Sequence, residues 1–146
     1  MYLLDTCVII DLVKGDPNTI LNFKSHAPNE INISAITELE LRYGIEQATK
    51  NKSKQIVQAL LSEINILPFT SSEAQKAAII CNELRAKGTP IGAYDLLIGA
   101  TALANDLIAV TANVKEFNRI SLLKMENWRN NFQLSEKNLI LYMDLE

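Results

Sequence analysis

The chain has 146 residues, of which 48% are hydrophobic and 21% are charged, and its formal net charge is −3. This length fits one folded domain, and the lack of a linker rich in Pro, Gly or Ser favours one domain over two. The acidic balance argues against a general nucleic-acid coat protein but not against a nuclease whose metal ions neutralise an acidic site.

No apolar run is long enough to span a bilayer, and the N-terminus lacks the features of a signal peptide. We therefore expect a cytoplasmic protein without membrane contact. The two cysteines, Cys7 and Cys81, are too few for a disulfide framework and are expected to be small buried residues. The only histidine, His26, lies in a polar loop, so an enzyme with this sequence would rely on carboxylates and a metal.

The N-terminal stretch predicts a buried strand followed by a helix. Residues 2–4 form a short apolar run, and Asp5 comes where that run ends. A carboxylate at the carboxyl end of the first strand of an α/β sheet points into the crevice where such sheets bind ligands. Thr6 fits the N-cap of a helix that starts at Cys7 or Val8. The alternative role of Asp5 is to cap that helix and nothing more.

A second strand is predicted at 30–34 and a helix at 35–47. Glu40 lies about 70° from the centre of one apolar stripe of this helix, where a carboxylate is costly to bury without a partner. That stripe consists of Ile36, Leu39 and Tyr43, while Leu41 and Ile45 form a second apolar patch on the other side. The helix is therefore expected to be covered from two directions.

The middle of the chain predicts a helical hairpin, a strand and a further helix. The lysines at 50, 52 and 54 precede the second arm of the hairpin, and we interpret them as a solvated loop rather than an RNA contact. Pro68 limits the strand at 64–69 to a short or edge position. The run from Ser72 to Gln75 fits a capping box, which would open a helix that stops at Gly88.

The segment 91–104 predicts a helix that is apolar on nearly every face, with Asp95 as its only charged residue. A buried carboxylate needs a cation, hydrogen-bond donors or a metal. The alternative for Asp95 is an N-terminal cap that gains from the helix dipole. A strand at 107–111 follows and ends in polar residues, then an extended segment at 122–128 and a last apolar stretch at 139–143 that fits a further strand.

Alternating strands and helices predict an α/β fold, a three-layer α/β/α sandwich with a mostly parallel central sheet. Residues 1–128 would form its body, and 129–146 a C-terminal extension of the same domain with no assigned role. Because parallel strands bring their carboxyl ends to one edge, distant acids can converge there. Carboxylates packed together repel one another unless a divalent cation joins them, and Mg²⁺ or Mn²⁺ suits an all-oxygen site.

Five segments together resemble the PIN-domain ribonucleases, and more narrowly the VapC-type toxins of bacterial toxin-antitoxin pairs. They are LLDTCVIID at 3–11, SAITELELRYG at 34–44, PIGAYDLLI at 90–98, VTANVKEF at 110–117 and ENW at 126–128. The resemblance places the metal-binding acids on Asp5, Glu40 and Asp95. The fourth position is open, because many PIN domains have Asp where this chain has Asn113, while the toxin subgroup pairs an Asn there with the acid at Glu116.

The resemblance implies a PIN-like fold and metal-dependent hydrolysis of RNA phosphodiester bonds. Asp5 and Asp95 would hold the metal, with Glu40 and Glu116 as further ligands directly or through water. Thr6, Thr111 and Asn113 would bind these acids or the substrate. The implied partners are an RNA substrate, a second copy of the chain and a cognate antitoxin, for which Leu41, Ile45 and the hairpin after them are the candidate contacts.

Other functions place acids similarly. A haloacid-dehalogenase-type phosphotransferase needs an acid two residues after Asp5, where Cys7 stands. A two-component receiver domain needs a phospho-accepting Asp at the end of a central strand, and the strand at 64–69 ends without one. The third alternative is a PIN-like module that binds partners without catalysis, which the three retained acids argue against.

Overall fold

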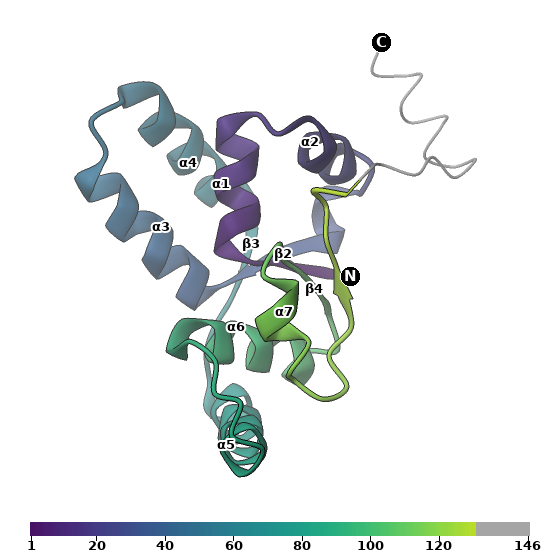
Figure 1. Cartoon of the computed structure of the whole chain (residues 1–146). Coiled ribbons are helices and arrows are strands. Elements are labelled where there is room, and N and C mark those ends of the chain that lie inside the picture. The colour runs from purple at the N-terminus through teal and green to yellow at the C-terminus, as the bar shows by residue number, and fades with distance from the viewer. Residues whose placement is uncertain (131–146) are drawn as a thin grey trace.

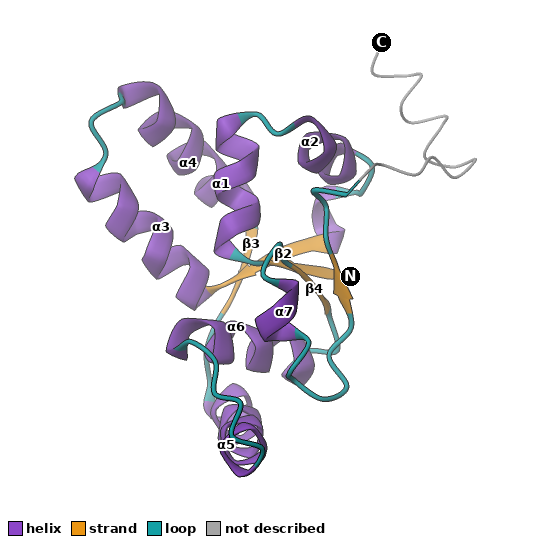
Figure 2. Cartoon of the chain, viewed as in Figure 1, coloured by secondary structure: helices purple, strands orange, loops and turns teal. Residues whose placement is uncertain are grey.

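A computed structural model describes residues 1–130, which form a five-stranded parallel sheet between layers of helices (Figures 1 and 2). The spatial order of the strands is β3-β2-β1-β4-β5, and every neighbouring pair is parallel. The strands are β1 (Tyr2–Leu4), β2 (Ile31–Ser34), β3 (Asn65–Leu67), β4 (Ile108–Val110) and β5 (Met125–Glu126). The predicted three-layer α/β/α architecture is confirmed, and β3 is at an edge of the sheet, as Pro68 indicated.

The helices divide between the two faces of the sheet. Helices α1 and α4 cover one face together with α2, and α5 and α6 cover the other, while α3 begins beside α6 and runs out along α4 (Figure 1). The helices are α1 (Thr6–Lys14), α2 (Pro17–Lys24), α3 (Ala35–Gln47), α4 (Asn51–Glu63), α5 (Ser71–Ala86), α6 (Ala93–Ala104) and α7 (Val114–Phe117), with a 3-10 turn at Pro28–Glu30. Within residues 1–130, no helix has the length and hydrophobicity needed to cross a membrane.

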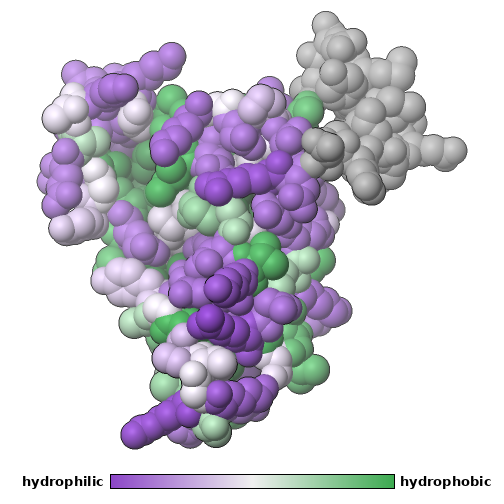
Figure 3. All heavy atoms as spheres, viewed as in Figure 1, coloured by the Kyte–Doolittle hydropathy of each residue, from purple (hydrophilic) through white to green (hydrophobic). Residues whose placement is uncertain are grey.

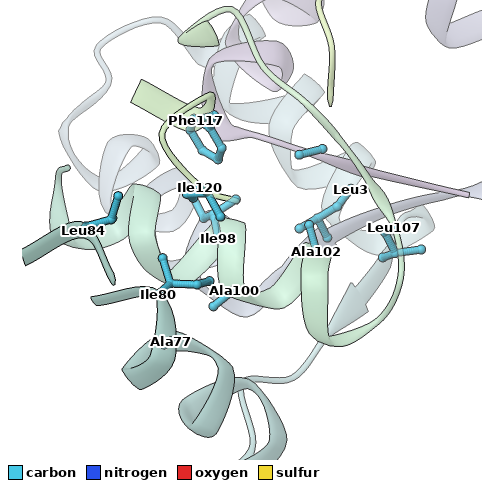
Figure 4. Packing of buried hydrophobic residues seen from close by; sticks show 11 residues of the cluster. Leu3, Ala77, Ile80, Leu84, Ile98, Ala100, Ala102, Leu107, Phe117 and Ile120 are labelled. Atoms are coloured by element: carbon cyan, nitrogen blue, oxygen red, sulfur yellow. The ribbon is translucent and has the colours of Figure 1, made fainter. Parts of the chain in front are cut away.

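Successive side chains of a strand point to opposite faces of the sheet, which produces two hydrophobic cores. Leu3 of β1 packs with α5 and α6 on one face of the sheet, and Leu4 packs with α1 and α4 on the other. Figure 4 shows the first core, in which Phe117 and Ile120 lie against Ile98 of α6. Trp128 is buried in the second core, where it fixes the chain beyond β5.

One local expectation, the buried face of α3, is wrong, and one helix, α2, was missed. Helix α3 buries Thr37 and Leu41, while Leu39 and Tyr43 of the predicted apolar stripe are 51% and 65% exposed. Helix α2 was not predicted. Its signal is nevertheless in the sequence, because Asp16 accepts hydrogen bonds from Thr19 as the N-cap and Pro17 occupies the first turn.

The helical hairpin is confirmed as α3 and α4, and the predicted bounds of α3 agree with the structure. The capping box of α5 joins Thr70 to Glu73 and not Ser72 to Gln75, so this helix begins at Ser71. Cys81 is exposed and Cys7 is half-buried, which corrects the expectation that both are buried. The predicted strand at 139–143 and most of the predicted extension at 129–146 lie outside the described residues.

Candidate active site

The site lies between the carboxyl ends of β1 and β4. The chain winds outward from this point in both directions, through β2 and β3 on one side and through β4 and β5 on the other. Open α/β sheets bind ligands at such a switch point, because the loops diverge there and leave a crevice. Asp5 follows β1 and Thr111 follows β4, and the backbone N–H of Asp5 donates to the carbonyl of Val110 at 2.9 Å.

Asp5 is buried, and each of its carboxylate oxygens has a partner. Oδ1 accepts the backbone N–H of Thr6 at 2.8 Å, so Asp5 is the N-cap of α1, and the prediction that Thr6 is the cap is wrong. Oδ2 accepts the hydroxyl of Thr111 at 2.8 Å, and the thiol of Cys7 lies 3.4 Å away. Burial and the neighbouring charge of Asp5 raise the pKa of Cys7 to about 11, which keeps the thiol protonated.

Thr6 connects the first acid to the second. Its hydroxyl donates to Oε1 of Glu40 at 2.7 Å and lies 3.2 Å from the hydroxyl of Thr37. The wheel position of Glu40 predicted that this carboxylate needs a partner, and Thr6 is that partner. Glu38 points elsewhere, since it pairs with Arg42 at 2.9 Å on the outer face of α3.

Asp95 lies in the first turn of α6, where Gly92 is the N-cap, so the capping alternative for Asp95 is not what the structure has. The side-chain amide of Asn113 donates to Oδ2 of Asp95 at 3.1 Å and to Oε2 of Glu116 at 3.0 Å. Burial, hydrogen bonding with Glu116 and the charge of Asp5 raise the pKa of Asp95 to about 7. Hydrogen bonds from Asp95 and Asn113 lower the pKa of Glu116.

Three of the predicted acids, Asp5, Glu40 and Asp95, line one cleft of about 490 Å³. Its lining consists of Asp5, Thr6, Cys7, Ile10, Glu40, Asp95, Ala112, Asn113 and Arg129. The structure therefore brings Asp5, Glu40 and Asp95 to one cleft. Thr111 and Glu116 are outside its lining, but Thr111 donates to Asp5, and Asn113 joins Glu116 to Asp95. As the side chains stand in the described part of the chain, no three His, Cys, Asp or Glu residues are grouped to hold a metal ion.

The sequence reasoning missed Arg129, which enters the cleft from the segment after Trp128. Its Nε and Nη2 donate to Asp11 of α1 at 2.6 and 2.9 Å, and these bonds raise the pKa of Arg129. A carboxylate on the helix that follows Asp5 was the only available signal. Its partner lies 118 residues away along the chain, so no local pattern joins the two.

The sequence model of the PIN domain matches residues 2–123. The chain belongs to the PIN domain family. This PIN domain is 33% identical over 128 residues to the tRNA(fMet)-specific endonuclease VapC of Salmonella typhimurium, an alignment that covers 87% of the chain and 97% of the relative. It is 34% identical to ribonuclease VapC2 of Haemophilus influenzae, with the same coverage.

Solved structures agree. The PIN domain superposes on a chain of VapBC2 from Rickettsia felis, solved bound to a DNA fragment from their promoter, with a TM-score of 0.80 and 34% identity over 87% of this chain and 98% of that one. The DNA-bound VapBC from Salmonella typhimurium gives a TM-score of 0.80 at 33% identity, over 87% and 97% of the two chains. These findings confirm the predicted fold class and family, and they exclude the dehalogenase and receiver alternatives.

Proposed function

We propose that this PIN domain is a metal-dependent ribonuclease, the toxin of a toxin-antitoxin pair, and that Asp5, Glu40, Asp95 and Glu116 are its catalytic acids. The observation that carries the proposal is one cleft lined by acids from segments far apart in the sequence. The relatives named as ribonucleases align over nearly their whole length, which supports the same class of reaction here. The substrate is RNA, and the bond cleaved is a phosphodiester.

The chemistry of the cleft fits Mg²⁺ or Mn²⁺. Its donors are carboxylate, amide and hydroxyl oxygens, which hard divalent cations prefer. Burial, hydrogen bonding with Glu116 and the charge of Asp5 raise the pKa of Asp95, and a bound divalent cation would favour its ionised form. Mg²⁺ commonly uses one or two carboxylates and keeps several waters, so three acids in direct contact are not required. Asp5 and Asp95 would be the direct ligands, with Glu40 and Glu116 as ligands directly or through water.

When bound, a divalent cation lowers the pKa of water and stabilises charge on a phosphate. The side chains around the acids fix their positions. The hydroxyl of Thr111 donates to Asp5, and the hydroxyl of Thr6 donates to Glu40. The side-chain amide of Asn113 donates to both Asp95 and Glu116. Positioning of this kind needs no histidine, in agreement with the location of His26, which stacks on Trp128 in the second core at a centroid distance of 5.5 Å.

The test is the loss of activity on neutralising the acids. Asp5→Asn and Asp95→Asn each keep the size of the side chain, and we expect either to reduce Mg²⁺-dependent RNA cleavage by at least 100-fold, a typical effect of removing a group that stabilises transition-state charge. Initiator tRNA is the first substrate to assay, because the Salmonella relative is named for it. Glu38→Gln, on the outer face of α3, is the matched control and should cleave like the wild type. Undiminished cleavage by both Asp variants would remove the proposed site.

The proposal includes two protein partners, a cognate antitoxin and a second copy of the chain. An apolar groove of about 240 Å³ adjoins the acidic cleft and is lined in part by Leu41, Ile45 and Ile10 (Figure 3 shows the apolar strip between α1 and the hairpin). We expect the antitoxin to cover this groove, and co-expression of the adjacent small gene should relieve growth arrest. Equal toxicity with and without the adjacent gene product would exclude the antitoxin. For the second copy of the chain, light scattering of the purified toxin should give the mass of a dimer.

A catalytically inactive PIN-like binding module remains the second candidate, favoured by the absence of a preformed three-acid group in the described chain. Calorimetric titration with Mg²⁺ and Mn²⁺ separates the two. A metal-dependent nuclease binds the cation through Asp5 and Asp95, and the Asp5→Asn variant loses that binding. A binding module shows no difference between wild type and variant.

A further inference from the structure

Among the described residues that line the acidic cleft, one carries a positive charge, Arg129. Its side chain is 51% exposed, while the side chain of its partner Asp11 is 11% exposed. A guanidinium carries five N–H groups, and the pair with Asp11 uses one on Nε and one on Nη2. Within residues 1–130, the side-chain hydrogen bonds of Arg129 use only Nε and Nη2, and Nη1 makes none. The edge of the guanidinium formed by Nε and Nη2 is thus bound to Asp11 of α1, while about half of the Arg129 side chain is exposed.

The backbone of Arg129 is held on both sides. The side chain of Asn18 on α2 donates to its carbonyl at 3.1 Å, and its own N–H donates to Oδ1 of Asn127 at 3.0 Å. The preceding residue, Trp128, is buried, and Asn22 donates to its carbonyl at 3.3 Å. A long cationic side chain normally loses much rotamer freedom when it binds a ligand. Here the contacts have already restricted that freedom.

We propose that Arg129 binds a phosphate of the RNA backbone beside the scissile bond, an inference that rests on the proposed ribonuclease function. A cleft with acids on its walls repels the polyanion that it must admit, so it needs a fixed positive charge at its edge. Arginine suits this role because its planar fork binds phosphate through two parallel hydrogen bonds. Asp11 positions the fork, and Arg129 orients the strand across Asp5 and Asp95.

A purely structural role for the pair is the competing explanation. The other arginine-carboxylate pair of the described chain, Arg42 with Glu38, is a spacing-four helix pair outside the lining of the cleft. It therefore serves as the matched control, since it has the same chemistry without the location.

The experiment measures binding of a short fluorescein-labelled single-stranded RNA by anisotropy, in an Asp95→Asn background that prevents cleavage. The double variant Asp11→Asn with Arg129→Gln replaces the ion pair by a neutral pair that can still hydrogen-bond. We expect its Kd at low salt to rise about tenfold, the effect of one charged contact. The slope of log Kd against log salt concentration should fall by about 0.7, the value for one phosphate contact to a single strand. Glu38→Gln with Arg42→Gln should change neither.

Each outcome separates this proposal from the proposed function. If the neutral Asp11/Arg129 pair keeps the Kd and salt slope of its parent while the wild type cleaves RNA, the phosphate contact is wrong and the ribonuclease stands. If the wild type neither binds nor cleaves RNA, both fail. Should the double variant not fold, Arg129→Lys keeps the charge but loses the fork, and we expect it to raise the KM for initiator tRNA severalfold with little change in kcat. A KM equal to that of the wild type would overturn the contact.

Discussion

Asp5 serves two purposes with its two carboxylate oxygens. Oδ1 caps α1 through the N–H of Thr6, and Oδ2 accepts the hydroxyl of Thr111, which is buried. A cap bond fixes the side chain in one rotamer, and each carboxylate oxygen has more than one lone pair, so acceptor capacity remains for a ligand. The cap is therefore part of the site, because it aims the acid at the cleft before any ligand arrives.

The raised pKa of Asp95 predicts a pH-dependent stability in metal-free buffer. The folded state binds the Asp95 proton up to about pH 7, whereas the ordinary pKa of this group is 3.8. The folded state thus holds more protons than the unfolded chain between those values, and the free energy of unfolding falls as the pH rises from about 4 to about 7. Because solvent screens a half-buried carboxyl, we expect a loss of about 1 kcal/mol.

Urea unfolding across this pH range, with EDTA present, measures the effect. Asp95→Asn should flatten the profile and be more stable than the wild type at pH 8. Glu46→Gln, on an exposed part of α3, should retain the wild-type profile. A wild type and an Asp95→Asn variant with parallel profiles would show that Asp95 is not the group responsible.

At the level of single residues, the sequence singles out the acids that line the cleft but not the residues that pair with them. Asp5, Glu40 and Asp95 are conspicuous because each interrupts an apolar pattern, where a carboxylate needs compensation. Arg129 and Asp11 are not conspicuous, because a charged residue in a polar segment resembles any solvated side chain. Their pairing depends on where the chain after Trp128 passes α1, which only the tertiary structure determines.

Helix α6 approaches its neighbours closely at one point, Gly99. A Cβ placed there would lie 2.5 Å from Cδ1 of Ile120, and Phe117 and Leu123 are within 4 Å (Figure 4 shows Phe117 and Ile120 around this helix). Gly44 on α3 differs, because a Cβ there would meet nothing within 4 Å. Both glycines are within helices, so they share the intrinsic cost of glycine and differ in packing.

Alanine substitution at the two glycines should therefore have opposite effects. We expect Gly99→Ala to lower the free energy of unfolding by about 1 to 3 kcal/mol through overpacking against Ile120. Gly44→Ala should raise it by up to about 1 kcal/mol, the difference in helix propensity. Chemical denaturation monitored by circular dichroism measures both, and a stabilising Gly99→Ala would show that the side chain of Ile120 moves away easily. Ile120→Val in the Gly99→Ala background should then recover part of the loss.

Helices are predictable from sequence where the N-cap residue and the spacing of apolar residues indicate the same bounds. Helix α3 has the predicted bounds because Ser34 caps it, accepting the N–H of Thr37 at 3.0 Å. The prediction of its buried face is wrong because α3 packs against α4 as well as against the sheet. The spacing of its apolar residues therefore did not determine which side is covered. Helix α2 is only eight residues long, and its weak apolar period hid the signal of Asp16 followed by Pro17.

For the whole molecule, the alternation of strands and helices predicts the layers but not the strand order. The order matters because it places β1 beside β4, and so Asp5 beside Thr111 and close to Asp95. Sequence neighbours alone would pair β4 with β3. The right-handed crossover rule limits the possible arrangements but leaves more than one. The expectation that the acids converge applied to any parallel sheet. The central position of β1 determines which strand ends, and so which acids, lie next to Asp5.

A site gathered from β1, α3, α6 and the loop after β4 links metal binding to the stability of the entire fold. Because the unfolded chain cannot hold these acids together, Mg²⁺ at the proposed site would bind the folded state and raise the free energy of unfolding by RT ln(1 + [Mg²⁺]/Kd). At ten times Kd the gain is about 1.4 kcal/mol, which for a chain of this size raises Tm by about 4 °C. The Asp5→Asn, Asp95→Asn double variant should show no rise, and NaCl at equal ionic strength should give none in the wild type. Differential scanning calorimetry over a Mg²⁺ series measures the shift, and equal shifts in wild type and double variant would mean that Mg²⁺ acts elsewhere on the surface.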